Sequence, residues 1–109
     1  MFFPQIDVCE RPTEVVILVE MPGVERKDVT ISWKNHILTI SGHKRRQPNT
    51  SNARYMCVER NYGPFRREIA IGIAIDYKQA RAELKNGLMK IHLPKAPEEK
   101  TQDTIPIES

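Results

Sequence analysis

Residues Ala82 to Leu93 read AELKNGLMKIHL, and this stretch decides the fold. Asn86-Gly87 at its centre is a two-residue turn typical of a β-hairpin, because both residues accept a positive φ. Beyond the turn, Met89, Ile91 and Leu93 alternate with polar residues. A repeat of two is the repeat of a strand with one buried face. The stretch therefore predicts two antiparallel strands joined by a tight turn.

The same alternation recurs along the chain. It predicts strands over Val29–Trp33 and Ile69–Ile75, while Val15–Val19 is apolar on both faces and predicts a central strand. Ile6 and Val8 predict a short strand, and Lys34–His36 a turn before another strand at Leu38–Ser41. Ile and Val together number nineteen against five Leu, a composition typical of sheets. We predict an all-β chain of seven short strands folded as an immunoglobulin-like antiparallel β-sandwich.

Length and composition limit the class of protein. A chain of 109 residues with 39% hydrophobic residues suits one domain. No apolar run exceeds Val15–Val19, so no membrane span and no membrane partner are expected. Met1–Pro4 shows no feature of a signal peptide. Cys9 and Cys57 lie far apart in a chain that needs no disulfide, which favours the reducing cytoplasm.

The sequence contains no recognisable catalytic or metal-binding constellation. His36, His43 and His92 each lack a Cys or carboxylate at ligand spacing. The five glycines are isolated, and no Ser or Cys lies in a nucleophile elbow. We therefore expect neither an enzyme nor a cofactor.

Positive charge is concentrated in one part of the chain. Residues 43–67 hold seven basic residues and one acid, whereas the whole chain has a formal charge of only +3. His43–Arg46 begins a long polar loop, residues 43–54, that either contacts phosphates or is a solvated loop at a strand edge. No aromatic residues are interleaved with the run to stack on bases, so we expect no nucleic acid partner.

The segment 95–109 is polar apart from Ile105-Pro106-Ile107. In an extended chain the two isoleucine side chains point the same way, about 7 Å apart. Pro106 restricts φ, which lowers the entropy lost on docking. The triplet could place two apolar side chains in a groove along a sheet edge, or it could be a chance triplet in a disordered tail. The residues alone leave both interpretations open.

Several short motifs follow one another along the chain. They are IDVCE at 6–10, EMPGV at 20–24, LTISG at 38–42, ERNYGPFRR at 59–67, and AELKNGLM at 82–89 leading to IHLPK at 91–95. In the order and spacing of these motifs the chain resembles the small heat shock proteins of the bacterial and plant type, with their α-crystallin domain, and Ile105-Pro106-Ile107 is similar to the family's C-terminal I-x-I motif. The resemblance implies three parts: residues 1–4 as the remnant of an N-terminal arm, 5–94 as the α-crystallin domain, and 95–109 as a flexible C-terminal extension.

The resemblance also implies where subunits meet. The long loop is expected to carry a strand that pairs with the partner's first strand, and Arg67 is expected to pair with a carboxylate across this interface. The tail motif is expected to dock between two strands of the sandwich. The implied interface residues are Ile6, Val8, Arg54, Tyr55, Met56, Val58, Glu59 and Arg67, and the implied groove residues are Val29, Ile31, Ala82 and Leu84.

The function implied by the resemblance is that of an ATP-independent chaperone, a holdase. Such a protein binds partly unfolded client proteins and prevents their aggregation. It is expected to form a homodimer and, through the tail, larger oligomers whose weak contacts act together. The alternative from another class is a β-sandwich interaction module, or co-chaperone, that does not assemble. Two departures from the family pattern are the short segment before residue 5 and Ile71-Gly72 in place of the usual Leu-Pro.

Overall fold

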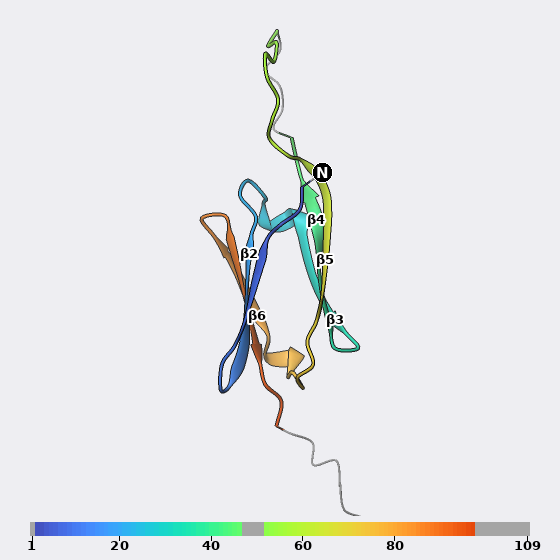
Figure 1. The fold of residues 1–109 in the computed structure, drawn as a ribbon, viewed down its shortest axis with the longest axis vertical. Coiled ribbons are helices and arrows are strands. Elements are labelled where there is room, and N and C mark those ends of the chain that lie inside the picture. The colour runs from blue at the N-terminus through green and yellow to red at the C-terminus, as the bar shows by residue number, and fades with distance from the viewer. Residues whose placement is uncertain (1, 47–51, 98–109) are drawn as a thin grey trace, which may run out of the picture.

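Two antiparallel sheets face each other across the core (Figure 1). The structure is a computed structural model and describes residues 2–46 and 52–97. One sheet has the order β1-β2-β7-β6 and the other β3-β4-β5. The strands are β1 (Ile6–Glu10), β2 (Glu14–Glu20), β3 (Val29–Lys34), β4 (Ile37–Lys44), β5 (Gly63–Ala70), β6 (Arg81–Lys85) and β7 (Leu88–Pro94). The predicted β-sandwich is confirmed.

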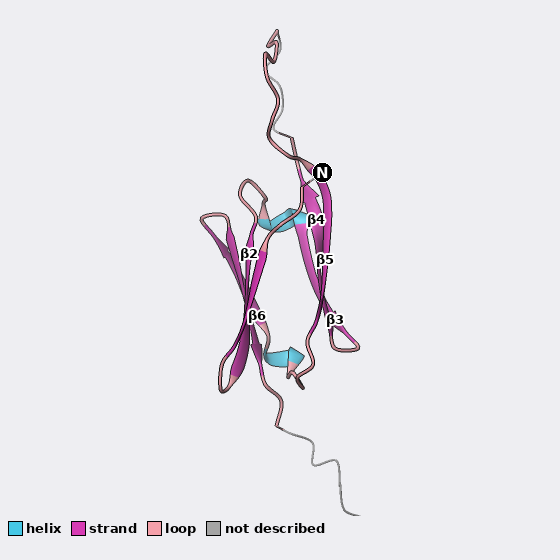
Figure 2. Ribbon diagram, viewed as in Figure 1, coloured by secondary structure: helices cyan, strands magenta, loops and turns pink. Residues whose placement is uncertain are grey.

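Short 3-10 turns and tight hairpins connect these strands (Figure 2). The turns are η1 (Arg26–Asp28), just before β3, and η2 (Tyr77–Gln79), just before β6. Asn35 and His36 have φ values of 51° and 62°, and Asn86 and Gly87 have 53° and 77°. Two successive positive φ angles match the right-handed twist of the flanking strands. Both predicted hairpin turns are therefore present.

The core lies between the inner faces of the two sheets. Ile17 and Val19 of β2, Ile40 of β4 and Ile91 of β7 are almost completely buried. Val16 is on the opposite side of β2 and is still only 6% exposed. β2 lies between β1 and β7, so its interior position agrees with the continuous apolar run Val15–Val19.

The start of the chain also packs into the sandwich. Pro4 is fully buried, and Phe2 is only 9% exposed. The Phe2 ring meets the Phe65 ring edge-on with 5.6 Å between centroids. Lys44 is buried as well, with its Nζ 4.5 Å from the centre of the Phe2 ring. The resemblance assigned Phe2 and Pro4 to the remnant of an N-terminal arm, but both residues contribute to the packing of the domain.

Two segments differ from the strands predicted from sequence. β5 ends at Ala70, so the alternation Ile69–Ile75 does not form one strand. Ile71 and Ile75 are nevertheless buried, because the chain crosses here from one sheet to the other over the end of the core. β4 extends through Lys44, so the first residues of the predicted loop 43–54 belong to a strand.

Residues 52–62 form a long arm that extends beyond the end of the sandwich where the N-terminus lies (Figure 1). Within this single chain, residues 54–59 form no strand. The pairing of this segment with a partner's first strand stays a prediction.

Candidate docking groove and dimer surface

β3 and β6 are the edge strands of opposite sheets, and a groove runs between them. The predicted groove residues Val29, Ile31, Ala82 and Leu84 line a single hollow of about 290 Å³, together with Arg26 and Met89. Val29 and Ile31 are half-buried because alternate residues of β3 face inward. Sequence reasoning placed these four residues on two strands, and the structure brings them together.

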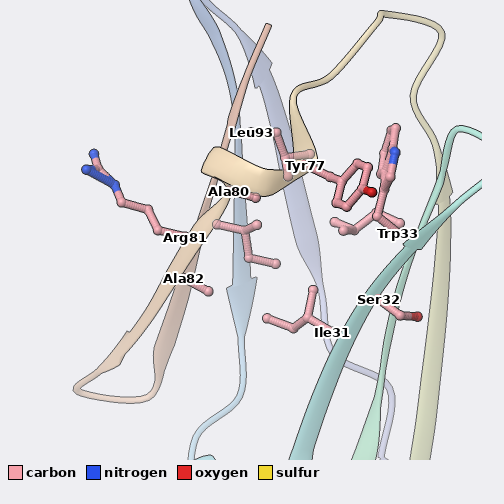
Figure 3. Close-up of a pocket in the computed structure, with 10 residues that line it drawn as sticks. Ile31, Ser32, Trp33, Tyr77, Ala80, Arg81, Ala82 and Leu93 are labelled. Atoms are coloured by element: carbon pink, nitrogen blue, oxygen red, sulfur yellow. The ribbon is translucent and has the colours of Figure 1, made fainter. Parts of the chain in front are cut away.

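A second hollow of about 300 Å³ continues the groove and shares Ile31 and Ala82 with the first. Trp33 and Tyr77 line one end of it, and Figure 3 shows their rings beside each other. The side chain of Arg81 points away from the hollow in the same view. The two hollows therefore form two adjoining compartments of one groove.

Sequence reasoning did not assign Trp33 and Tyr77 to the groove. Trp33 continues the inward alternation of Val29 and Ile31, so the period-two pattern could have indicated it. Tyr77 belongs to η2 and is 57% exposed. No local pattern in the sequence marks a residue of such a turn as part of a groove.

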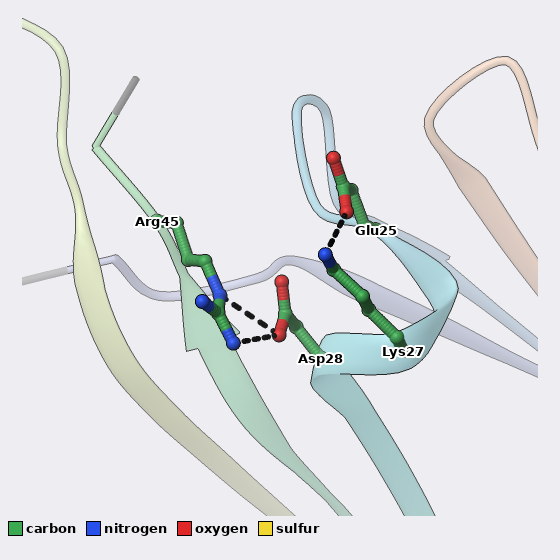
Figure 4. A network of polar contacts seen from close by, with 4 residues as sticks. All are labelled: Glu25, Lys27, Asp28 and Arg45. Atoms are coloured by element: carbon green, nitrogen blue, oxygen red, sulfur yellow. Dashed lines mark hydrogen bonds and ion pairs between the residues drawn. The ribbon is translucent and has the colours of Figure 1, made fainter. Parts of the chain in front are cut away.

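An ion pair joins Asp28, the last residue of η1 before β3, to Arg45, directly after β4 (Figure 4). Arg45 Nη2 lies 2.8 Å from Asp28 Oδ1, and its Nε donates to the same oxygen. This hydrogen bond and the nearby negative charge raise the pKa of Arg45 above its usual value. Lys27 pairs with Glu25 at 3.2 Å on the solvent side of the same turn. The Arg45 pair fixes Asp28, directly before the groove residue Val29.

The predicted dimer surface consists of β1 and the arm. β1 pairs with β2 along one side, and its other side is the edge of the sheet. Val8 is 48% exposed and Ile6 half-buried. On the arm, Met56 is 97% exposed and Val58 57%, and Arg54, Tyr55 and Glu59 are exposed too. Exposed apolar side chains on two separate segments are typical of surfaces that meet a partner.

Arg67 lies on the inner side of β5 and is half-buried. Its Nη1 donates to the backbone oxygen of Pro4 at 2.7 Å, and its guanidinium lies 4.3 Å from the centre of the Phe3 ring. The sequence-based expectation gave this arginine a carboxylate partner in another subunit. Within the single chain its partners are the residues directly before β1.

The remaining features are the tail motif, a metal site, His92 and a membrane span. Ile105, Pro106 and Ile107 lie outside the described residues. Within residues 2–46 and 52–97, no group of three or more His, Cys, Asp and Glu side chains could hold a metal ion. His92 is half-buried, and its Nδ1 lies 3.3 Å from Glu14 Oε2. In the part of the chain that is described, no helix is long and apolar enough to cross a membrane.

Known proteins similar to this chain share one family. Residues 7–108 match the Hsp20/alpha crystallin family. The chain belongs to this family. It is 36% identical over 99 residues to small heat shock protein C2 of Rickettsia felis, covering 91% of this chain and 64% of that one. It is also 36% identical to heat shock protein 16 of Schizosaccharomyces pombe over 95% of this chain and 74% of the relative.

Solved structures of the family have the same fold. The structure of heat shock protein 16.0 from S. pombe superposes with a TM-score of 0.84 at 34% identity, covering 99% of this chain and all of that one. Small heat shock proteins are chaperones and not enzymes. The chain spans 57 to 64% of the length of three bacterial relatives, the C2 protein among them.

Proposed function

We propose that this chain is a cytoplasmic, ATP-independent holdase that binds partly unfolded proteins and prevents their aggregation. Family membership supports a chaperone role. The observation that carries the finer proposal is the presence of two apolar surfaces on opposite edges of one sheet. One is β1 with the exposed arm, and the other is the groove beside β6.

The first surface is where two chains would form a dimer. The arm of each subunit would add to the edge of the partner's β1, so that each subunit gives and receives one strand. A two-fold axis makes such contacts self-complementary. Edge strands with unpaired backbone groups readily accept another strand.

The groove would receive the tail motif of another subunit. Ile105 and Ile107 of an extended tail stand about 7 Å apart, which suits two compartments that share Ile31 and Ala82. Each such contact is small, so assembly would depend on several tails acting together. Dimers would then associate into larger oligomers that exchange subunits.

Two measurements test this function. The chain at several-fold molar excess, without ATP, should suppress the light scattering of a heated test client. Native mass spectrometry should show dimers and multiples of dimers for the wild type, and dimers alone for the double variant Ile105→Ser, Ile107→Ser. The matched control is Thr104→Ser, which leaves both isoleucines in place and should assemble like the wild type.

Two outcomes would contradict the proposal. Unchanged scattering would argue against the holdase activity. A monomer at all concentrations would favour a non-assembling interaction module.

A further inference from the structure

Lys44 is the only buried charged residue of the described chain, with 7% of its surface exposed. Its ammonium forms no hydrogen bond and no ion pair with any described residue. The Phe2 ring, whose centre lies 4.5 Å from Lys44 Nζ, replaces only part of the lost hydration. Every fully buried side-chain nitrogen of the described residues has a hydrogen-bond partner, so the Lys44 ammonium, which has none, still reaches the surface. An anion arriving from solvent could therefore pair with it.

A second cation lies beside this ammonium. A Cβ atom built on Gly23 would be 3.9 Å from Lys44 Nζ and 3.7 Å from Arg60 Nη2, so both charged groups are within 4 Å of one point. Arg60 forms no ion pair with a described residue either. Burial and the charge of Arg60 both lower the pKa of Lys44, and no carboxylate acts against them. The repulsion between the two cations is thus not offset within the described chain.

The turn after β2 keeps the space beside these cations open. The N–H of Val24 donates to Met21 O at 3.2 Å, and Gly23 has a φ of 79°, as in a type II turn, whose third residue favours glycine. A side chain at Gly23 would meet Lys44 Cε at 3.3 Å. The turn lies at the end of the sandwich where the N-terminus lies (Figure 1). Glycine therefore leaves both charged groups accessible from one side.

The other arginines of the basic run that begins the long polar loop have partners. Arg45 forms the ion pair with Asp28 described above. The guanidinium of Arg46 lies 4.7 Å from the centre of the Tyr55 ring. Lys44 is the basic residue of this run whose ammonium lies beside the glycine turn. Of the two interpretations of the run, contact with a phosphate therefore applies to Lys44 and not to its two neighbours.

We propose that Lys44 and Arg60, beside the open turn at Gly23, bind one phosphate group. A guanidinium offers N–H donors in a planar fork and an ammonium offers a point charge, and proteins use both to hold phosphate. A phosphate group carries close to two negative charges at neutral pH and so balances both cations, whereas a carboxylate balances only one. The site lies within one chain and needs no second subunit, so it is independent of the proposed dimer and of the tail.

Equilibrium dialysis of the full chain against radiolabelled inorganic phosphate, at constant ionic strength in chloride, tests the site. Two hydrogen bonds between charged groups predict one bound phosphate per chain with a Kd of about 1 mM. Arg60→Gln should raise this Kd about tenfold, because it removes one of the two charges. Arg66→Gln is the matched control, since this exposed arginine pairs with Glu68 and should leave the Kd unchanged.

Competition with unlabelled anions identifies the ligand. Displacement by ADP at a concentration at least about tenfold below that of phosphate would identify a nucleotide as the source of the phosphate group. Displacement by ADP only at similar or higher concentrations would identify the free ion. Acetate that displaces the label as well as phosphate does would overturn the proposal in favour of a carboxylate site. The absence of saturable binding, or an equal loss of affinity in Arg66→Gln, would overturn it as well.

Thermal unfolding gives a second, independent test. A ligand that binds only the folded chain raises Tm, whereas the general salting effect of phosphate acts on every variant alike. At ten times the wild-type Kd, phosphate should therefore raise the Tm of the wild type by about 4 to 8 °C more than the Tm of Arg60→Gln. Arg66→Gln should respond like the wild type. Equal rises in the wild type and Arg60→Gln would refute the site, whatever the state of assembly of the chain.

Discussion

Gly42 lies in β4 opposite Val29 and Phe65, and replacing it by alanine should strongly destabilise the domain. A Cβ atom built at this position would overlap the backbone oxygen of Asp28 and approach Phe65 Cζ to 2.8 Å. Real Cβ contacts essentially never fall below 3.0 Å, and the first obstacle is backbone. The start of β3 therefore has to move away from β4.

The cost follows from that movement. Forcing extra volume into a packed site typically destabilises by about 1 to 3 kcal/mol, and a backbone obstacle favours the upper end, about 3 kcal/mol. For a domain of this size, 1 kcal/mol corresponds to a change of about 4 to 8 °C in Tm, so we expect Gly42→Ala to lower Tm by about 12 to 24 °C. The same shift would disturb the Asp28–Arg45 pair and the groove wall at Val29.

Thermal unfolding followed by circular dichroism, at one protein concentration and scan rate, measures this effect. Gly72→Ala is the matched control, because a Cβ there meets nothing within 4 Å. It should leave Tm unchanged or raise it slightly, since alanine restricts the unfolded chain. A fall of less than about 5 °C for Gly42→Ala would show that the overlap relaxes cheaply, and the reasoning from close packing would be refuted.

Three further predictions concern the groove, the first residues of the chain and pH. Ala82→Trp should fill the space shared by both hollows and reduce oligomers to dimers in native mass spectra, with little change in Tm because Ala82 is exposed. Arg67→Met should lose the hydrogen bond to Pro4 O and lower stability by about 1.5 kcal/mol in denaturant titrations; an unchanged midpoint would contradict this. Burial and the charge of Arg60 lower the pKa of Lys44 below 10.5 in the folded chain. Between the folded pKa and 10.5 the unfolded chain binds more protons, so stability rises with pH in that window. Lys44→Met should lack this rise, and its Tm relative to wild type should fall as the pH approaches 10.5; a constant difference would refute the assignment.

Local chemistry made much of the fold predictable. Asn35-His36 and Asn86-Gly87 determine their hairpins through positive φ angles, which depend on no distant residue. The isoleucines from 69 to 75 were misleading for a physical reason. A strand with one buried face buries every second residue. A segment that crosses the end of a core can bury every second residue as well, without forming a strand.

Other features depend on contacts between distant parts of the chain. Lys44 appeared to belong to a solvated basic run, yet it is only 7% exposed, because the first residues of the chain pack over it. The four groove residues were carried over by family resemblance, and they do line one hollow. The second compartment depends on η2, which brings Tyr77 beside Trp33, and no period in the sequence indicates that approach.

The strand order β1-β2-β7-β6 places the two acceptor edges at opposite ends of one sheet. In the proposed assembly, binding at one edge would leave the other edge free, and each subunit would connect two neighbours through independent contacts. Substitutions could then change the strength of one contact between subunits without altering the other contact. Loss of either contact would also expose the edge of a strand. Disassembly would therefore create a surface to which an unfolding chain can add a strand.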